Sequence, residues 1–248
     1  QFLRYMARLG IPCYIPIYPR KPKNLYVPYI FSEEELKKIF KAADELMFVR
    51  RNFKCGIFSI PVLLRLLYST GMRIGEACSL INSDVDMSSR IILVRNTKNK
   101  RDRQLPISDS LYQVLEQYLI KRDKLPLHNM GNPNSPFLIS LDGSSLTGVS
   151  ARHWFYKILE ASDIDYIPKV GPRIHDLRHT FAVHVLDKLV KEGVDMHCCL
   201  PVLSMALGHK CVSDTEYYVR ITNQVYPHLS DTTSAISEYV FPTISTMK

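Results

Sequence analysis

The sequence lacks an uninterrupted apolar run of the roughly 20 residues that a membrane-spanning helix needs. Its most apolar stretch, GIFSIPVLLRLLYST at 56–70, is interrupted by Pro61 and Arg65, so we expect a buried helix of a folded domain there. The six cysteines form no CxxC pair and no secretory pattern accompanies them, which favours reduced thiols in the cytoplasm over a disulfide framework. Internal repeats and low-complexity tracts are also absent.

Positive charge is in excess. The chain carries 32 Lys and Arg against 24 Asp and Glu, a formal net charge of +8, and 46% of its residues are hydrophobic. The apolar content is that of a folded domain with a core. The charge raises the expectation of a polyanionic partner, and a phosphate backbone is the commonest one.

The first 28 residues differ from the rest. Residues 1–10 have a helical rhythm and begin with Gln rather than Met, so we expect the remnant of a preceding domain. Residues 11–28 contain five prolines, which disfavour a helix and predict an extended linker. This linker is basic and is either a plain spacer or an arm along DNA; its cations are Arg20, Lys21 and Lys23. The main domain is expected at 29–248.

Within that domain the hydrophobic period is mostly helical. Ser32 and Glu35 form a capping-box pattern that predicts a helix to about Phe48. β-branched runs around a polar turn at 84–107 predict a small antiparallel sheet. Further helices are predicted at 59–69, 109–123, 146–162, 174–191, 201–207 and 214–223, before a mixed tail at 226–248. The predicted fold class is α+β, mostly α-helical, with one small antiparallel β-sheet.

Two basic segments can be interpreted in two ways. In STGMRIGEACSL at 69–80, Arg73 and Glu76 lie on one helix face. They either form a surface ion pair, or the Glu76 carboxylate orients the Arg73 guanidinium for a bidentate contact with phosphate. The turn TKNKRDR at 97–103 is either a solvated turn or a hairpin that pushes an ammonium into a groove. Its cations are Lys98, Lys100, Arg101 and Arg103.

The segment GPRIHDLRHTFAVHVL at 171–186 places His175 and Arg178 on one helix face, with His179 four residues after His175. The HxxxH spacing is similar to that of zinc proteases. However, Arg178 would set a fixed cation beside a dication, and Val185 stands where one extended zinc signature needs a third histidine. Imidazole beside guanidinium suits an anion better, so we predict no metal.

Two adjacent tyrosines follow near the C-terminus. Ser213 and Glu216 form a second capping-box pattern, which predicts a helix from about Asp214 and a hydrophobic staple between Val212 and Tyr217. Tyr218 then points about 100° away from Tyr217 and toward a cleft shared with His209.

Taken in order, TGMRIGEACSL, TKNKRDRQLPI, HDLRHTFA, LGH and the tyrosine nine residues after that histidine resemble the catalytic domain of the tyrosine recombinase (phage integrase) family, over residues 29–225. The resemblance implies that Arg73 and Arg178 clamp the scissile phosphate and that Tyr218 is the nucleophile of a 3′-phosphotyrosine bond. It implies that Lys98, or Lys100 two residues away, protonates the leaving 5′ oxygen. It implies that His175 and His209 assist proton transfer and phosphate binding. It also implies that Glu76 is the acidic residue that supports this site in the family.

The resemblance also implies a site-specific recombinase or integrase acting on double-stranded DNA without a cofactor, as a tetramer on paired sites, with accessory DNA-bending proteins as partners. Residues 1–10 would then end a core-binding domain, and 226–248 would be a segment of the kind that family members pass to a neighbouring protomer. Integration or excision of a mobile element is expected, in a bacterial, nucleoid-associated setting. The alternatives are Xer-like resolution of chromosome dimers and a catalytically silent DNA-binding module. A type IB topoisomerase shares the chemistry, but the chain is short for one.

Overall fold

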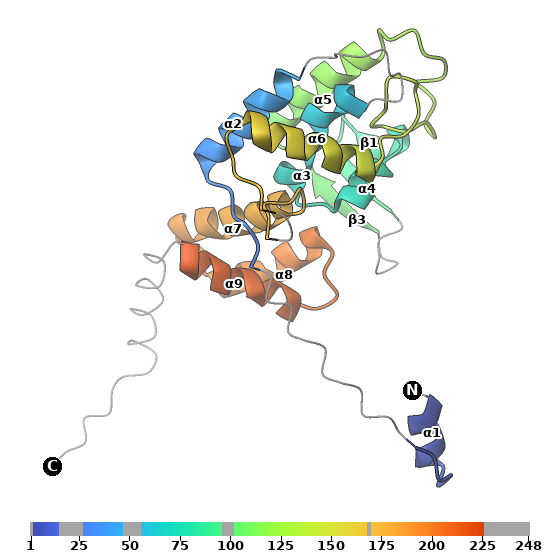
Figure 1. The fold of residues 1–248 in the computed structure, drawn as a ribbon, viewed down its shortest axis with the longest axis vertical. Helices are drawn as coiled ribbons and strands as arrows, with labels where there is room; N and C mark the ends of the chain where they lie inside the picture. Colours follow the sequence, from blue (N-terminus) through green and yellow to red (C-terminus); the bar gives the residue numbers. More distant parts are fainter. Residues whose placement is uncertain (1, 15–26, 47–55, 96–101, 168–169, 226–248) are drawn as a thin grey trace, which may run out of the picture.

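The computed structural model describes residues 2–14, 27–46, 56–95, 102–167 and 170–225 (Figure 1). Several predicted features lie outside these residues: the linker cations Arg20, Lys21 and Lys23, the hairpin cations Lys98, Lys100 and Arg101, and the tail 226–248. Within the described part of the chain, no helix is long and apolar enough to cross a membrane.

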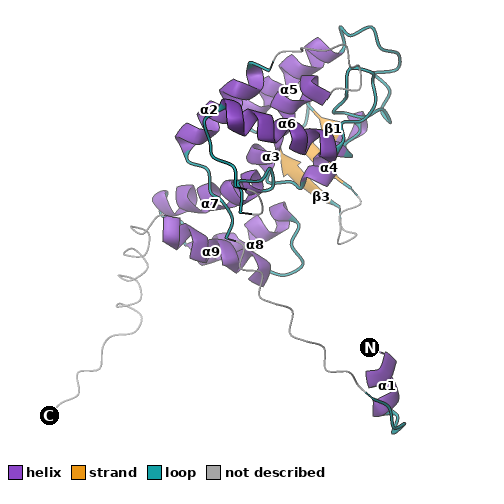
Figure 2. Ribbon diagram, in the orientation of Figure 1, coloured by secondary structure: helices purple, strands orange, loops and turns teal. Residues whose placement is uncertain are grey.

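The architecture is mostly helical with a three-stranded sheet (Figure 2), which confirms the predicted fold class. The first half contains α1 (Phe2–Arg8), α2 (Glu33–Asp44), the 3₁₀ turn η1 (Gly56–Ser59), α3 (Ile60–Thr70), α4 (Ile74–Cys78), the 3₁₀ turn η2 (Asn82–Asp84) and β1 (Val85–Asp86). The second contains β2 (Ile91–Val94), β3 (Arg103–Pro106), α5 (Asp109–Arg122), α6 (Gly148–Ala161), α7 (Asp176–Lys191), α8 (Met196–Leu207) and α9 (Ser213–Val225).

The sheet has the order β1-β2-β3, and both pairs are antiparallel. Val85 pairs with Ile92, and Ile92 in turn pairs with Leu105. Ile92 and Leu105 are both buried, so one face of the sheet packs against the core. At the other end of the β2–β3 ladder Val94 pairs with Arg103, which brings Arg103 to the edge of the site described below.

The sequence sets the helix ends at two places that matter for the site. Ser32 and Glu35 form the predicted capping box at the start of α2. α3 ends at Gly71, whose φ of +63° is a left-handed conformation that favours glycine. The chain therefore turns sharply there and enters α4 at Arg73.

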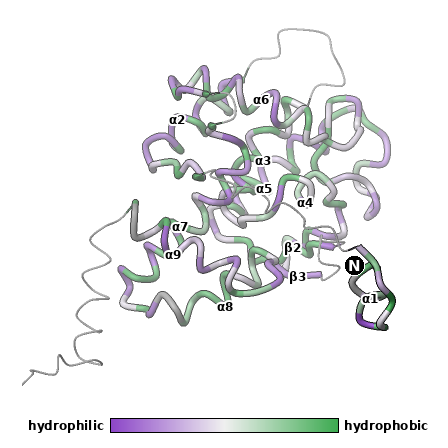
Figure 3. The backbone as a smooth tube through the Cα atoms, turned by 60° about the horizontal axis from the view of Figure 1, so that its bottom comes forward, coloured by the Kyte–Doolittle hydropathy of each residue, from purple (hydrophilic) through white to green (hydrophobic). Residues whose placement is uncertain are grey.

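Buried apolar side chains form two clusters. The larger one joins α2, α3, α5 and α6 to the sheet, with Phe31, Leu63 and Phe155 among its buried members. The smaller one lies between α7, α8 and α9, which sit together below α3 and the sheet in Figure 1. Hydrophobic and hydrophilic segments alternate along the helices in Figure 3, as expected for helices with one buried face.

Of the last two predicted helix starts, that of α8 is wrong, whereas that of α9 agrees to within one residue. α8 begins at Met196 rather than near residue 201, because Cys199 and Leu200 are buried against the smaller cluster and extend the helix ahead of Pro201. α9 begins at Ser213, one residue earlier than predicted, and Ser213 is not its cap. The Val212 carbonyl accepts from the Thr215 and Glu216 N–H groups, while the Ser213 hydroxyl donates to the Cys211 sulfur.

Candidate active site

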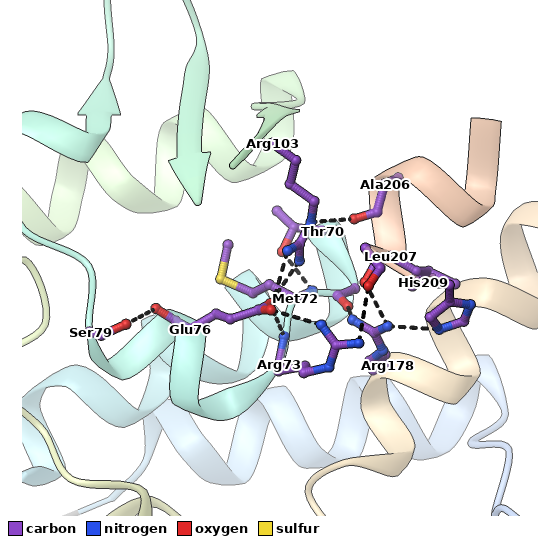
Figure 4. A network of polar contacts seen from close by, with 12 residues as sticks. Thr70, Met72, Arg73, Glu76, Ser79, Arg103, Arg178, Ala206, Leu207 and His209 are labelled. Atoms are coloured by element: carbon purple, nitrogen blue, oxygen red, sulfur yellow. Dashed lines mark hydrogen bonds and ion pairs between the residues drawn. The ribbon is translucent and has the colours of Figure 1, made fainter. Parts of the chain in front are cut away.

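Arg178 is the buried centre of a cationic cluster (Figure 4). Its Nη1 donates to the Gly71 carbonyl at 2.6 Å, and its Nη2 donates to the Leu207 carbonyl at 2.7 Å and lies 2.9 Å from His209 Nε2. These partners come from the turn after α3 and from the end of α8. One guanidinium therefore fixes three elements, and burial lowers its pKa to about 10, which leaves it charged at neutral pH.

Arg73 lies beside it, at the N-cap of α4 rather than inside the first turn. Its backbone N–H donates to Glu76 Oε2 at 2.9 Å, and its Nη1 donates to Glu76 Oε1 at 2.8 Å. Nη2 donates to the Gly208 carbonyl at 3.2 Å. The predicted pairing of Arg73 with Glu76 is therefore present, and it orients the guanidinium.

Arg103 differs from its predicted role as a DNA-binding hairpin cation. Its side chain is 10% exposed, and its guanidinium forms two hydrogen bonds with the carboxylate of Glu76, Nη2 to Oε2 at 2.7 Å and Nη1 to Oε1 at 3.2 Å. Its Nε donates to the Ala206 carbonyl at 2.8 Å. The side chain turns inward because Glu76, itself buried, needs a second cation. Burial would raise the pKa of Glu76, but the hydrogen bonds from Arg103 and Arg73 lower it to about 2.

Each residue of the LGH motif at 207–209 supplies one hydrogen-bond partner to an arginine of the cluster. The Leu207 carbonyl binds Arg178, the Gly208 carbonyl binds Arg73, and the His209 ring binds Arg178. Gly208 has a φ of +65°, and a Cβ there would lie 2.9 Å from Arg103 Nη1. The left-handed turn therefore favours glycine, and a Cβ at this position would require the Arg103 guanidinium to shift.

His175 lies at the N-cap of α7 and lines a surface depression of about 440 Å³ with Arg73, Glu76, Ser79 and Arg95. Arg95, which sequence reasoning did not single out, is 47% exposed and forms an ion pair with the buried Asp84 at 2.6 Å. The depression thus joins exposed guanidinium groups to an imidazole, which suits a phosphate group.

Tyr218 lies on the inner side of this cluster and is 3% exposed. Its hydroxyl is 2.9 Å from His179 Nδ1, and its ring is stacked on that of His209 with an interplanar angle of 7°. Tyr217 is 41% exposed and Val212 is 38% exposed. Because α9 already begins at Ser213, Val212 is the residue at the cap, so the predicted register of a staple between Val212 and Tyr217 is wrong. The buried face of α9 contains Thr215, Tyr218 and Thr222, and Tyr217 lies one step round from it.

Thr215 holds His209 in place, since its hydroxyl is 2.8 Å from His209 Nδ1. Burial first, and then the charge of Arg178, lower the pKa of His175 and that of His209 to about 4. Burial, followed by His175 and Arg178, lowers the pKa of His179 to about 3. All three imidazoles are therefore neutral at pH 7. Burial raises the pKa of Tyr218, while Arg178 opposes that shift.

The structure therefore brings together most of the predicted catalytic residues: Arg73, Glu76, His175, Arg178, His209 and Tyr218. Lys98 and Lys100 lie outside the described residues. Sequence reasoning gave no role in this site to Arg95, Thr215 or His179, although His179 shares a helix face with His175 and was weighed there only as a metal ligand. No spacing rule points to Thr215 or Arg95.

The chain is similar to a known family over most of its length. The model of the phage integrase family matches residues 30–224. A Sinorhizobium fredii protein with the provisional name integrase/recombinase y4rB is 31% identical over 223 residues, which cover 88% of this chain and 70% of that protein. The tyrosine recombinase XerA of Pyrococcus horikoshii is 30% identical over 208 residues, covering 83% of this chain and 61% of that protein.

Solved structures share the fold. The crystal structure of XerA recombinase aligns with a TM-score of 0.59 at 24% identity, covering 90% of this chain and 71% of that chain. The Tn1549 transposon integrase, solved with a circular intermediate DNA, aligns with a TM-score of 0.60 at 20% identity, covering 80% of this chain and 63% of that chain. With its motifs, its fold and the match over 30–224, this chain belongs to the phage integrase family, whose curated relatives include tyrosine recombinases.

Proposed function

We propose that the protein is a site-specific DNA recombinase that cuts and rejoins DNA through a 3′-phosphotyrosine bond at Tyr218. The observation that carries the proposal is the position of this buried tyrosine, stacked on His209 and close enough to Arg178 for that cation to act on its pKa. A phenol so placed beside two arginines is set to attack a phosphodiester bound by them.

In the proposed step, the Tyr218 oxygen attacks phosphorus and the bond from phosphorus to the 5′ oxygen breaks. The two guanidiniums of Arg73 and Arg178 stabilise the negative charge that builds on the non-bridging oxygens. The leaving 5′ oxygen takes a proton, for which Lys98 remains the proposed donor. The tyrosyl phosphodiester conserves the bond energy, so a free 5′ hydroxyl can reverse the step without ATP.

Integration or excision of a mobile element is the proposed setting. The similarity to a protein named integrase/recombinase and the fold shared with a transposon integrase support it. Chromosome-dimer resolution is the second candidate for the biological setting, because other relatives are named XerA and XerC. A tetramer on paired DNA sites is proposed for either setting. Sequencing of DNA excised or joined in cells that express the protein separates the two candidates.

The test compares two neighbouring tyrosines. A library of nicked duplexes is incubated with the protein, and only DNA that stays attached under denaturing conditions is kept, which selects the cleaved site. We expect wild type and Tyr217→Phe to give adducts, because Tyr217 is exposed and outside the cluster. Tyr218→Phe should bind the same DNA and give no adduct.

An adduct from Tyr218→Phe would overturn the proposal. Failure of wild type to form any adduct while it binds the DNA would instead indicate a silent DNA-binding module.

A further inference from the structure

The Tyr218 hydroxyl has a hydrogen-bond partner, His179, that has no role in the cleavage step proposed above. His179, on the same helix as Arg178, places its Nδ1 2.9 Å from the Tyr218 hydroxyl. The rings are close as well, with centroids 5.6 Å apart. His179 in turn lies edge-on to His175, with ring centroids 5.0 Å apart. A line of side chains therefore runs from the surface depression to the buried phenol.

Attack by a tyrosine requires that its proton leave. The pKa of Tyr218 is raised by burial, so little phenolate exists at neutral pH. Arginine side chains have no acceptor. The His209 ring is stacked on Tyr218, but its Nε2 faces Arg178 and its Nδ1 faces Thr215, so both of its nitrogens are engaged. His179 is the imidazole that meets the hydroxyl directly.

We propose that His179 is the general base of the cleavage step, taking the Tyr218 proton on Nδ1 as the phenol oxygen attacks the phosphate. This rests on the proposed function. The O–H bond of Tyr218 breaks, an N–H bond forms on His179, and the oxygen electron pair forms the bond to phosphorus. On rejoining, the proton returns from His179 to the departing tyrosine oxygen, so the enzyme ends as it began.

The charge state of His179 agrees with this role. Burial, then His175, Arg178, Arg173 and His209 lower its pKa to about 3, so the ring is neutral before DNA binds. A neutral ring protonated on Nε2 presents a free lone pair at Nδ1. A bound phosphodiester brings negative charge to the same cations and favours the imidazolium that the step creates.

The chain offers a matched control on the same helix. His184 Nδ1 lies 3.0 Å from the Tyr68 hydroxyl, which repeats the contact of His179 with Tyr218 away from the cationic cluster. Loss of this second pair removes the same kind of hydrogen bond from α7 without touching the proposed nucleophile. Any effect of a histidine-to-asparagine change on packing therefore appears in both variants.

The experiment measures the rate of adduct formation by His179→Asn and His184→Asn. The asparagine amide can keep a polar atom near the Nδ1 position but cannot take a proton. Each variant is given the selected duplex and the same duplex with a sulfur in place of the bridging 5′ oxygen. A thiolate leaves without help from a general acid, so a defect in leaving-group protonation disappears on this substrate, whereas a defect in activating tyrosine remains.

We expect His179→Asn to form adduct about a hundredfold or more slowly on both substrates, with DNA affinity unchanged, and His184→Asn to match wild type. Wild-type rates for His179→Asn would overturn the proposal, as would recovery on the sulfur substrate alone. If His179→Asn unfolds below the assay temperature, the rates of adduct formation on the two substrates are measured with His179→Gln instead. Adduct formation by Tyr218→Phe would instead overturn the proposed function, so the two failures are distinguishable.

Discussion

At the scale of single residues, Arg178 links parts of the fold and also lies beside the proposed nucleophile, Tyr218. Its guanidinium reaches carbonyls on two different elements and a histidine ring on a third side. A lysine has one nitrogen on a flexible stem and cannot span those partners, so buried carbonyls would be left without donors. The same planar group is the one proposed to hold phosphate. Stability and catalysis are therefore coupled at this residue.

We expect Arg178→Lys to slow adduct formation by about a hundredfold or more and to lower the free energy of unfolding by about 2 kcal/mol. Arg73→Lys is the matched control, since the Arg73 side chain is 27% exposed. It should slow adduct formation by a similar factor and change stability by less than about 1 kcal/mol. Denaturant unfolding and denaturing gels measure the two quantities. Equal losses of stability in both variants would contradict this separation.

At the scale of elements, the turn between α3 and α4 positions the cluster. Gly71 ends α3 in the left-handed conformation and presents its carbonyl to Arg178. A Cβ at this position would lie 2.4 Å from the ring of Phe181, which packs against the smaller core cluster. The turn is therefore constrained twice, by its backbone angles and by the helix α7 behind it.

We expect Gly71→Ala to lower the free energy of unfolding by about 2 kcal/mol or more, from the left-handed backbone and the clash together. Adduct formation should fall as well, because the Gly71 carbonyl moves away from Arg178. Gly75→Ala is the control for stability, since a Cβ there meets nothing within 4 Å. That variant should be as stable as wild type or slightly more so. A Gly71→Ala protein with wild-type stability would show that the turn can relax.

At the scale of the whole molecule, burying several histidines beside arginines makes folding sensitive to acid. Their pKa values in the folded protein are about 4 for His175, about 3 for His179 and about 4 for His209, against 6.5 ordinarily. As pH falls through 6.5 the unfolded chain takes up these protons and the folded chain does not, so stability falls with pH. Glu76, with a pKa lowered to about 2, loses its contribution only below 4.5.

We expect the midpoint of thermal unfolding to drop by about 5 °C or more between pH 7 and pH 5. The three histidines are the cause, so His179→Asn should show a shallower dependence than wild type over the same range. Calorimetry at constant ionic strength measures both. A midpoint that is constant from pH 7 to pH 5 would mean that the imidazoles protonate freely in the folded state.

Local patterns were enough to predict the fold class, because the hydrophobic period and the helix caps depend on neighbouring residues. The capping box at Ser32 and the β pattern at 84–107 each depend on residues that are near one another in the sequence. Contiguous motifs also predicted Arg73, Arg178 and His209 as candidate site residues, and the structure brings these three side chains together.

The orientation and partners of those side chains depend on tertiary contacts. Arg103 reads as a hairpin cation, but it turns inward because buried Glu76 requires a second partner from 27 residues away. Tyr218 rather than Tyr217 faces the cluster, and the predicted cap at Ser213 was the wrong reason for it. The rotation of α9 is set by packing of Thr215 and Tyr218 against α7 and α8. The contact of His179 with Tyr218 joins residues 39 apart, and burial between helices, which no local pattern encodes, creates it.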